Sequence, residues 1–222
     1  MHNNVTLLGA TGLIGSHVLR LLLEDPVTEQ ITILLRREIS TQDPRLVKHI
    51  VDFPQTTGWA PLVTGDTLIS CLGTTRKQAG GNNELYRFTD HDIPLNAAKA
   101  ALQNGGRRMI IVSSLGANAQ SRFFYPRLKG ELEAALRELP FESLYILRPS
   151  FLTGERAVSR PAEQFFGKFL GAFSPLFTGQ LEKYKPIEAA AVAGAIVFLL
   201  HSGKAGQFIY ESDQIAALAK GV

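Results

Sequence analysis

The chain has 222 residues, of which 45% are hydrophobic, enough for one globular domain with a sizeable core. Its 23 basic and 20 acidic residues leave a formal net charge of +3 without any block of Lys or Arg, which argues against a nucleic-acid partner. The single cysteine, Cys71, excludes an internal disulfide and a cysteine metal cluster, so we expect no metal and a reducing compartment.

Apolar runs of strand length alternate with longer segments of helical spacing. The predicted strands are 5–8, 31–35, 46–51, 67–71, 109–112, 143–147 and 207–210. The predicted helices are 13–24, 84–103 with a break or kink at Pro94, 125–138, 188–200 and 213–220. Such alternation implies βαβ units and a parallel sheet covered on both faces. We therefore expect an α/β fold, a doubly wound parallel sheet of Rossmann type with right-handed crossovers.

Residues 150–187 interrupt the alternation and are rich in Phe, Gly and Pro. We expect loops with one or two short helices there, forming a small C-terminal substrate lobe. Residues 1–222 are then a single domain. No Lys or Arg precedes the first apolar run, so the N-terminus is not a typical signal peptide, and 189–200 is too short to span a bilayer. We expect a cytoplasmic protein with no membrane partner.

The stretch GATGLIGSHVLRLLL follows the first predicted strand and opens the first predicted helix, as a dinucleotide fingerprint requires. Gly9 allows a tight turn, Gly12 allows backbone to approach a pyrophosphate, and Gly15 allows close packing of helix on strand. The helix N-terminus supplies free N–H groups to the phosphates. The spacing is GxxGxxG rather than GxGxxG, and glycines that serve only the turn are the alternative.

Arg36 and Arg37 follow the second predicted strand, where NAD enzymes usually carry an acidic residue that holds the ribose 2′-hydroxyl. An arginine can instead clamp a 2′-phosphate. The sequence therefore predicts NADP(H) over NAD(H), with Arg36 as the better candidate and Arg37 stacking on adenine. A pair of solvated loop arginines is the alternative.

Ser113 and Ser114 end the fifth predicted strand, and Tyr125 and Lys129 follow four residues apart on one face of a predicted helix. An ammonium beside a phenol favours the phenolate. Tyr125 could then pass a proton to or from a substrate carbonyl or alcohol, while Ser114 holds the same oxygen and Lys129 also holds the nicotinamide ribose. A surface Tyr and Lys at this spacing is the alternative.

The order of these motifs resembles the short-chain dehydrogenase/reductases of the atypical or extended kind. More narrowly, it is similar to the Tat-interacting-protein-like oxidoreductases. The resemblance runs from residue 8 to about 161 and is carried by GATGLIGSHVLRLLL, LLRRE, SCLGTTRKQAG, VSSLGA, YPRLKGELEA and LRPSFLTGERAVSRP. The most specific segments are CLGTTRKQAG and the SRP that follows LTGER.

The resemblance implies an NADPH site and a proton donor or acceptor at Tyr125. The implied cofactor-binding residues are Thr11, Gly12, Leu13, Ile14, Gly15, Arg36, Arg37, Leu72, Gly73, Tyr125, Lys129, Leu152 and Arg160. Register with the wider family favours Ser114 over Ser113. The chain has no clear equivalent of the asparagine that many relatives use beside the triad, and Asp90 lies in its usual region.

These motifs together predict an NADPH-dependent oxidoreductase that acts on a small carbonyl or alcohol substrate. The alternative is an NADPH-binding regulatory or protein-interaction module with little catalysis, because the family is also known for regulatory binding. A sugar-nucleotide epimerase is disfavoured by the short substrate lobe. The sequence leaves the substrate, a protein partner and the oligomeric state open.

Overall fold

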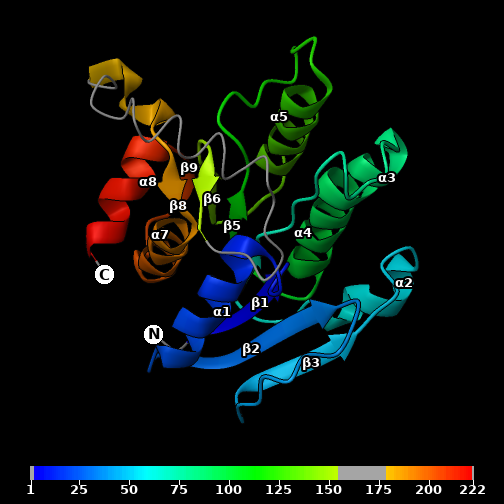
Figure 1. Cartoon of the computed structure of the whole chain (residues 1–222). Coiled ribbons are helices and arrows are strands. Elements are labelled where there is room, and N and C mark those ends of the chain that lie inside the picture. The colour runs from blue at the N-terminus through cyan, green and yellow to red at the C-terminus, as the bar shows by residue number, and fades with distance from the viewer. Residues whose placement is uncertain (1–2, 155–178, 222) are drawn as a thin grey trace.

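The computed structural model describes residues 3–154 and 179–221 (Figure 1). The strands are β1 (Asn3–Leu8), β2 (Thr28–Leu35), β3 (Leu46–Ile50), β4 (Thr67–Ser70), β5 (Arg108–Val112), β6 (Ser143–Arg148), β7 (Leu152–Thr153), β8 (Ile187–Glu188) and β9 (Gly206–Glu211). The α-helices are α1 (Leu13–Glu24), α2 (Thr56–Trp59), α3 (Asn83–Arg87), α4 (Ile93–Gln103), α5 (Phe124–Arg137), α7 (Ala189–His201) and α8 (Ser212–Leu218). A π-helical turn, Phe88–Asp92, joins α3 to α4, and short 3₁₀ turns occupy Ala60–Leu62, Gly179–Tyr184 and Ala219–Gly221.

Seven strands form one parallel sheet in the order β3-β2-β1-β4-β5-β6-β9. The order reverses at β1, whose neighbours are β2 and β4, so the topological switch point lies between β1 and β4. Leu8 at the end of β1 pairs with Leu34 on β2 and Ser70 on β4. The residues that follow these three strands therefore meet at one edge, where doubly wound folds bind their ligands.

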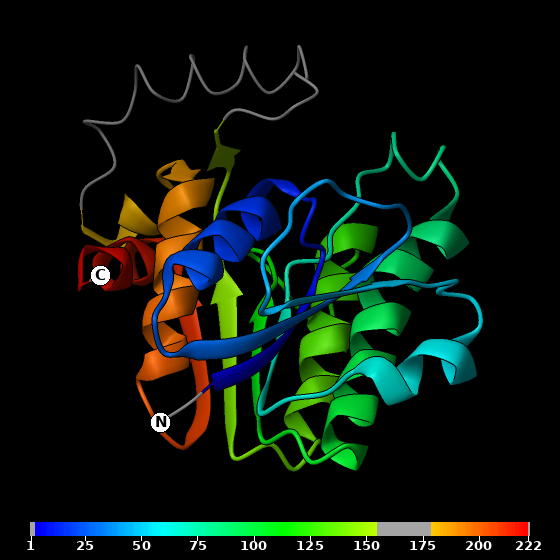
Figure 2. The same cartoon turned by 90° about the horizontal axis from the view of Figure 1, so that it is seen from below.

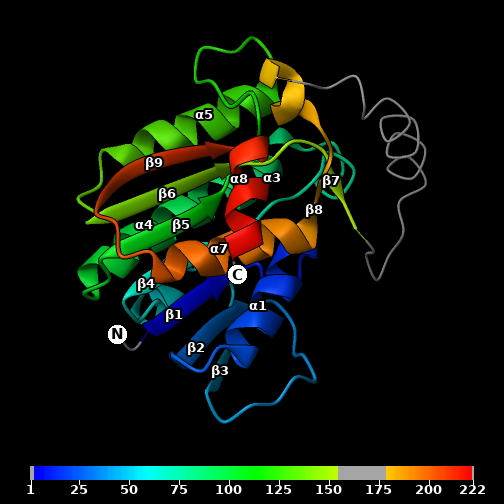
Figure 3. The same cartoon turned by 90° about the vertical axis from the view of Figure 1, so that its left-hand side faces the viewer.

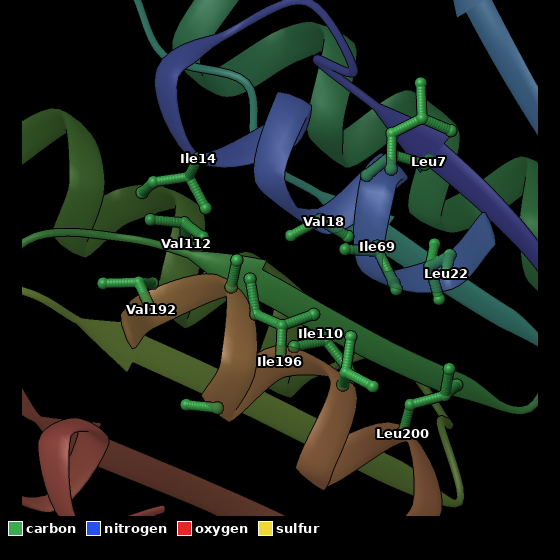
Figure 4. Close-up of a cluster of buried hydrophobic side chains, with 14 of the residues drawn as sticks. Leu7, Ile14, Val18, Leu22, Ile69, Ile110, Val112, Val192, Ile196 and Leu200 are labelled. Carbon is green, nitrogen blue, oxygen red and sulfur yellow. The ribbon is translucent and has the colours of Figure 1, made fainter. Parts of the chain in front are cut away.

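Helices cover both faces of the sheet. Figures 1 and 2 show α1 and α7 against one face and α4 and α5 against the other, and Figure 3 shows α8 beside α7. The first face buries a cluster from β1, β4, β5, α1 and α7 that includes Leu7, Val18, Ile69, Ile110 and Ile196 (Figure 4). The second face buries Trp59 and the apolar sides of α4 and α5. Both faces of the central strands are buried, so their sequences are continuous apolar runs.

The predicted α/β fold with a doubly wound parallel sheet is confirmed. The strands β1 and β2 begin at buried polar residues, Asn3 and Thr28, which hydrophobic spacing does not detect. The predicted helix 84–103 is divided into α3, the π turn and α4, with Pro94 in the first turn of α4. Proline has no N–H to continue the helical bonds.

The proposed lobe at 150–187 falls partly outside the described residues. Its described ends form a two-stranded parallel sheet in which Leu152 pairs with Ile187 and Thr153 pairs with Glu188. Such a non-local pairing of two-residue strands leaves no periodic signal in the sequence. In the described part of the chain, no helix is both long and apolar enough to cross a membrane.

Candidate active site

The glycine-rich turn joins the end of β1 to the start of α1. Gly9 has a φ of +78°, a conformation that favours glycine. A Cβ at Gly9 would lie 2.8 Å from the carbonyl carbon of Cys71, and a Cβ at Gly15 would lie 2.0 Å from the carbonyl oxygen of Gly9. These two glycines therefore let β1, α1 and the end of β4 approach one another. Gly12 is exposed, and a Cβ there would lie 3.1 Å from the same carbonyl oxygen.

The N-terminus of α1 is open to a ligand. Gly12 is the N-cap and offers no side-chain cap, and the first turn carries no acidic residue. The N–H groups of a first helical turn have no partners within the helix, and the helix dipole is positive there. Thr11 is exposed, Leu13 is half-buried and Ile14 is buried in the core. This cradle fits the pyrophosphate of a dinucleotide.

Arg36 and Arg37 follow β2 and are exposed. Neither has an ion-pair partner among the residues that the structure describes. The next acidic side chain, Glu38, is held by Lys48, whose Nζ lies 2.7 Å from a carboxylate oxygen. The hydrogen bond from Lys48 lowers the pKa of Glu38. The Glu38 carboxylate is thus paired with Lys48, which leaves both guanidinium groups available to an anion.

Leu72 and Gly73 continue the chain after β4, beside the glycine turn. The peptide N–H of Cys71 donates to the carbonyl of Leu8, 2.9 Å away, which fixes this segment against β1. Leu152 lies on β7 and packs against the core of the first face. Arg160 lies outside the described residues.

Tyr125 and Lys129 lie one turn apart on α5, as predicted. The Lys129 Nζ is 5.9 Å from the centroid of the Tyr125 ring. Tyr125 is half-buried, whereas Lys129 is almost completely buried. Tyr86 of α3 stacks on the Tyr125 ring at a centroid separation of 5.9 Å and an interplanar angle of 13°. The Tyr125 ring therefore contacts both a buried cation and a second aromatic ring.

Lys129 forms an ion pair with Asp90 of the π turn, with 3.0 Å between Nζ and Oδ1. The Lys129 side chain is 3% exposed and the Asp90 side chain 1%. The other carboxylate oxygen of Asp90 accepts a hydrogen bond of 2.7 Å from the peptide N–H of Thr74. Asp90 thus joins the segment after β4 to α5.

The two serines after β5 differ in exposure, since Ser113 is buried and Ser114 is half-buried. Ser113 is buried and donates a short hydrogen bond to Glu133 of α5. Glu133 is also paired with the Arg148 guanidinium at the end of β6, with Nε 3.0 Å and 3.1 Å from the two carboxylate oxygens. Ser114 is half-buried, and its hydroxyl makes one long contact of 3.3 Å to the carbonyl of Leu115.

The sequence alone gave no role to four residues of this arrangement, Tyr86, Asp90, Glu133 and Arg148. One signal was available, since Glu133 follows Lys129 by four residues and shares its face of the helix. The partners Asp90 and Arg148 lie on other elements, and no spacing rule connects them to α5. In the described part of the chain, no group of three or more His, Cys, Asp or Glu side chains could hold a metal ion.

Comparisons with known proteins identify relatives over nearly the whole chain. The HIM1 family model matches residues 38–169. The protein fmp52, mitochondrial, of Emericella nidulans is 36% identical over 96% of this chain and 97% of its own. The protein FMP52, mitochondrial, of Candida albicans is 32% identical over 97% of this chain and 98% of its own. Protein HTATIP2 of Rattus norvegicus is 34% identical over 77% of this chain and 72% of its own.

Among solved structures, the Bordetella bronchiseptica enzyme WbmG in complex with NAD is similar to this chain with a TM-score of 0.69 and 17% identity. The match covers 99% of this chain and 77% of WbmG. The fold of this chain is therefore that of WbmG. Together with the HIM1 family match and the HTATIP2 relative, this likeness confirms the predicted resemblance to the atypical or extended short-chain dehydrogenase/reductases.

The prediction of a cytoplasmic location is wrong. Four relatives that are 32–40% identical to this chain are named as mitochondrial proteins. A single cysteine indicates a reducing compartment but does not distinguish one reducing compartment from another.

Proposed function

Because this chain belongs to the HIM1 family and has the NAD(P)-binding fold of the short-chain dehydrogenase/reductases, we propose that it is an NADPH-dependent oxidoreductase. Its substrate in this proposal is a small carbonyl or alcohol compound. The observation that carries the proposal is the half-buried Tyr125 phenol with the buried Lys129 ammonium 5.9 Å from its ring centroid. A cation beside a tyrosine ring can stabilise the negative charge that develops on a phenol oxygen as it gives up its proton, so this arrangement supports Tyr125 as the proton donor or acceptor.

The proton transfer takes place at the Tyr125 hydroxyl oxygen. In the reducing direction, the phenol donates its proton to the substrate carbonyl oxygen, and Lys129 stabilises the phenolate that remains. Ser114 donates a hydrogen bond to the same oxygen. We assign this role to Ser114 because the Ser113 hydroxyl is already bonded to Glu133. NADPH, when bound, supplies the hydride.

The nucleotide half of the site supports the choice of NADPH. The open N-terminus of α1, with Thr11 and Gly12 exposed, would hold the pyrophosphate. Arg36, with Arg37 beside it, would clamp the 2′-phosphate, and the ion pair between Glu38 and Lys48 would reduce repulsion from the Glu38 carboxylate. Leu72 and Gly73 would border the nucleotide from the end of β4, and Leu152 from β7.

The test is Tyr125→Phe, which removes only the hydroxyl. We expect NADPH oxidation with a panel of aliphatic and aromatic aldehydes and ketones to fall by about 10²–10⁴-fold. The Kd for NADPH, measured by calorimetry, should stay within about twofold, since a hydroxyl deletion leaves the phosphate contacts intact. Tyr210→Phe, the same change on β9, is the matched control and should leave both quantities unchanged.

Normal turnover in Tyr125→Phe would contradict the mechanism. NADPH binding by the wild-type protein without turnover of any carbonyl in the panel would favour the regulatory alternative. In that case the protein would act as an NADPH-binding interaction module, and fold likeness to enzymes would not make it one.

The names of the relatives support a mitochondrial location for this chain as well. Immunoblots of mitochondrial and cytosolic fractions test this point. Recovery in the cytosolic fraction alone would contradict it.

A further inference from the structure

Asp90 lies on an unusual piece of backbone. The segment Phe88–Asp92 is π-helical, and the N–H of Ile93 donates to the carbonyl of Phe88 five residues earlier. Pro94 follows and has no N–H to offer to the carbonyl of Asp90. Single π turns are rare and recur at functional sites. The turn directs Asp90 into the protein, where its exposure is 0%.

The Asp90 carboxylate is held from both sides. The Thr74 N–H donates to Oδ2 at 2.7 Å, and the Lys129 Nζ lies 3.0 Å from Oδ1. A buried charge without a partner is strongly unfavourable, so each group of this pair requires the other. The bond from Thr74 also fixes the carboxylate relative to the segment that follows β4.

Three groups act on the Lys129 ammonium. Tyr125 and Glu133 lie on its own helix, and Asp90 lies on the π turn. Tyr86 of α3 stacks on the Tyr125 ring and interacts with Asp90. Glu133 is engaged by Arg148 and Ser113. Among the described residues, Asp90 is therefore the one carboxylate in direct ion contact with Lys129.

We propose that Asp90 is a positioning residue for proton transfer, whose carboxylate keeps the buried Lys129 protonated and fixed beside the Tyr125 ring. This inference rests on the proposed oxidoreductase function. It assigns to Asp90 an action through Lys129, without contact to substrate or cofactor. Loss of the carboxylate would leave the ammonium buried with no directly contacting anion.

The electrostatics agree with the geometry. Burial acts to lower the pKa of Lys129, but attraction to Asp90, with a smaller contribution from Tyr125, outweighs it and leaves that pKa raised. Burial also raises the pKa of Asp90, which is the cost of holding this carboxylate away from water. Because the folded-state pKa of Lys129 is raised, the cation is retained through the neutral range and lost only when the pH rises through that value.

The first test measures the charge of Lys129 without any turnover. The protein is labelled with ¹³C at lysine Cε, and the Lys129 signal is assigned by its loss in Lys129→Arg. In the wild-type protein we expect its NMR titration midpoint to lie above that of exposed lysines, ~10.4. In Asp90→Asn, which keeps an acceptor for the Thr74 N–H, we expect the midpoint to fall by at least about one pH unit.

Asp92→Asn is the matched control, because Asp92 lies on the same turn but is 40% exposed and pairs with His91 and Arg87. It should leave the Lys129 midpoint unchanged, and Asp90→Glu should restore most of the wild-type value. An unchanged midpoint in Asp90→Asn would overturn the proposal. If Asp90→Asn does not fold, the wild-type titration decides, since a midpoint below that of the exposed lysines would overturn it equally.

The second test is the pH profile of kcat/KM. Asp90→Asn should gain a descending alkaline limb at the lowered Lys129 midpoint, whereas Asp92→Asn should keep the wild-type profile. Loss of activity that is equal at every pH would mean a structural role and would overturn the proposal. If the wild-type protein shows no turnover, the proposed function fails, and the NMR titration still decides the role of Asp90.

Discussion

The two halves of the candidate site are built from different parts of the polypeptide. The backbone half lies at the end of β1 and consists of glycines, at positions where side chains would collide, and a helix N-terminus with no side-chain cap. The side-chain half lies along α5 and contains a buried ion pair between Lys129 and Asp90 and a second ion pair between Glu133 and Arg148. The first half presents free N–H groups, and the second presents fixed charges.

This difference follows from what each half would bind. A pyrophosphate needs close approach and several N–H donors, which bare backbone supplies. Proton transfer needs a phenol whose ionisation is adjusted by a nearby charge, and a buried charge needs a partner. We therefore expect substitutions in the backbone half to act by steric collision or loss of contact with the ligand. We expect substitutions in the side-chain half to act by changing the charges around Tyr125.

The largest expected effect is that of Gly15→Ala. Its Cβ would lie 2.0 Å from the carbonyl oxygen of Gly9, so β1 and α1 would have to separate. We expect the free energy of unfolding, measured in urea, to fall by about 3 kcal/mol, the upper range for overpacking. Gly12→Ala should change it by less than about 1 kcal/mol and weaken NADPH binding by about tenfold. Tight NADPH binding by Gly12→Ala would break the comparison.

Glu133→Ala should have an effect of similar size, because it leaves the Arg148 side chain, which is 22% exposed, without its carboxylate partner. We expect a loss of about 3 kcal/mol in the free energy of unfolding, as when one member of a buried pair is removed. Glu131→Ala, two residues earlier on the same helix, is the control and should cost less than about 1 kcal/mol. An equal loss of unfolding free energy in the two variants would mean that the ion pair between Glu133 and Arg148 stabilises the fold no more than an exposed pair does.

Arg36→Ala should affect binding alone. We expect the Kd for NADPH to rise by about 10–100-fold, the range for loss of a charge-assisted hydrogen bond, while the Kd for NADH is unchanged. Arg107→Ala is the control, because Arg107 precedes β5 at the opposite edge of the sheet and is 68% exposed. Equal weakening of NADPH and NADH by Arg36→Ala would show that Arg36 does not recognise the 2′-phosphate.

The smallest expected effect on NADPH binding is that of thiol reagents, which act on Cys71. Burial raises the pKa of its thiol to about 12, so the reactive thiolate is rare near neutral pH. Iodoacetamide should label the native protein far more slowly than the urea-unfolded chain, by about 10³-fold or more. NADPH binding should be unchanged after an exposure that fully labels the unfolded chain. If Cys71 of the native protein were labelled as fast as in the unfolded chain, the segment around Cys71 at the end of β4 would have to open readily to solvent.

The sequence predicted the sheet and the conformation of the glycine turn well, for a common reason. Apolar runs and glycine spacing are local features, and a parallel strand or a strand–helix turn imposes them locally. Helix α1 begins at Leu13 and ends at Glu24 as predicted, and Gly9 has the positive φ that its position requires. The boundaries were less accurate where a buried polar residue, such as Asn3 or Thr28, opens a strand.

The side-chain half was predictable only in part. Tyr125 and Lys129 were recognised because both lie on one helix at a fixed spacing. The ion pair with Asp90 joins residues 39 positions apart, and depends on how α5 packs against the π turn. Ser113 and Ser114 were indistinguishable in sequence, since the difference between them is a hydrogen bond to Glu133 from another element.

The small sheet of β7 and β8 joins two segments of the chain that are more than 30 residues apart in the sequence. Leu152 and Ile187 are paired, and the N–H of Ile187 donates to the carbonyl of Phe151, 2.9 Å away. A closed base of this kind makes the entropy of the intervening chain depend only weakly on its length. Insertions between Leu152 and Ile187 would therefore cost little additional loop-closure entropy, about 0.6 kcal/mol for each doubling of the length.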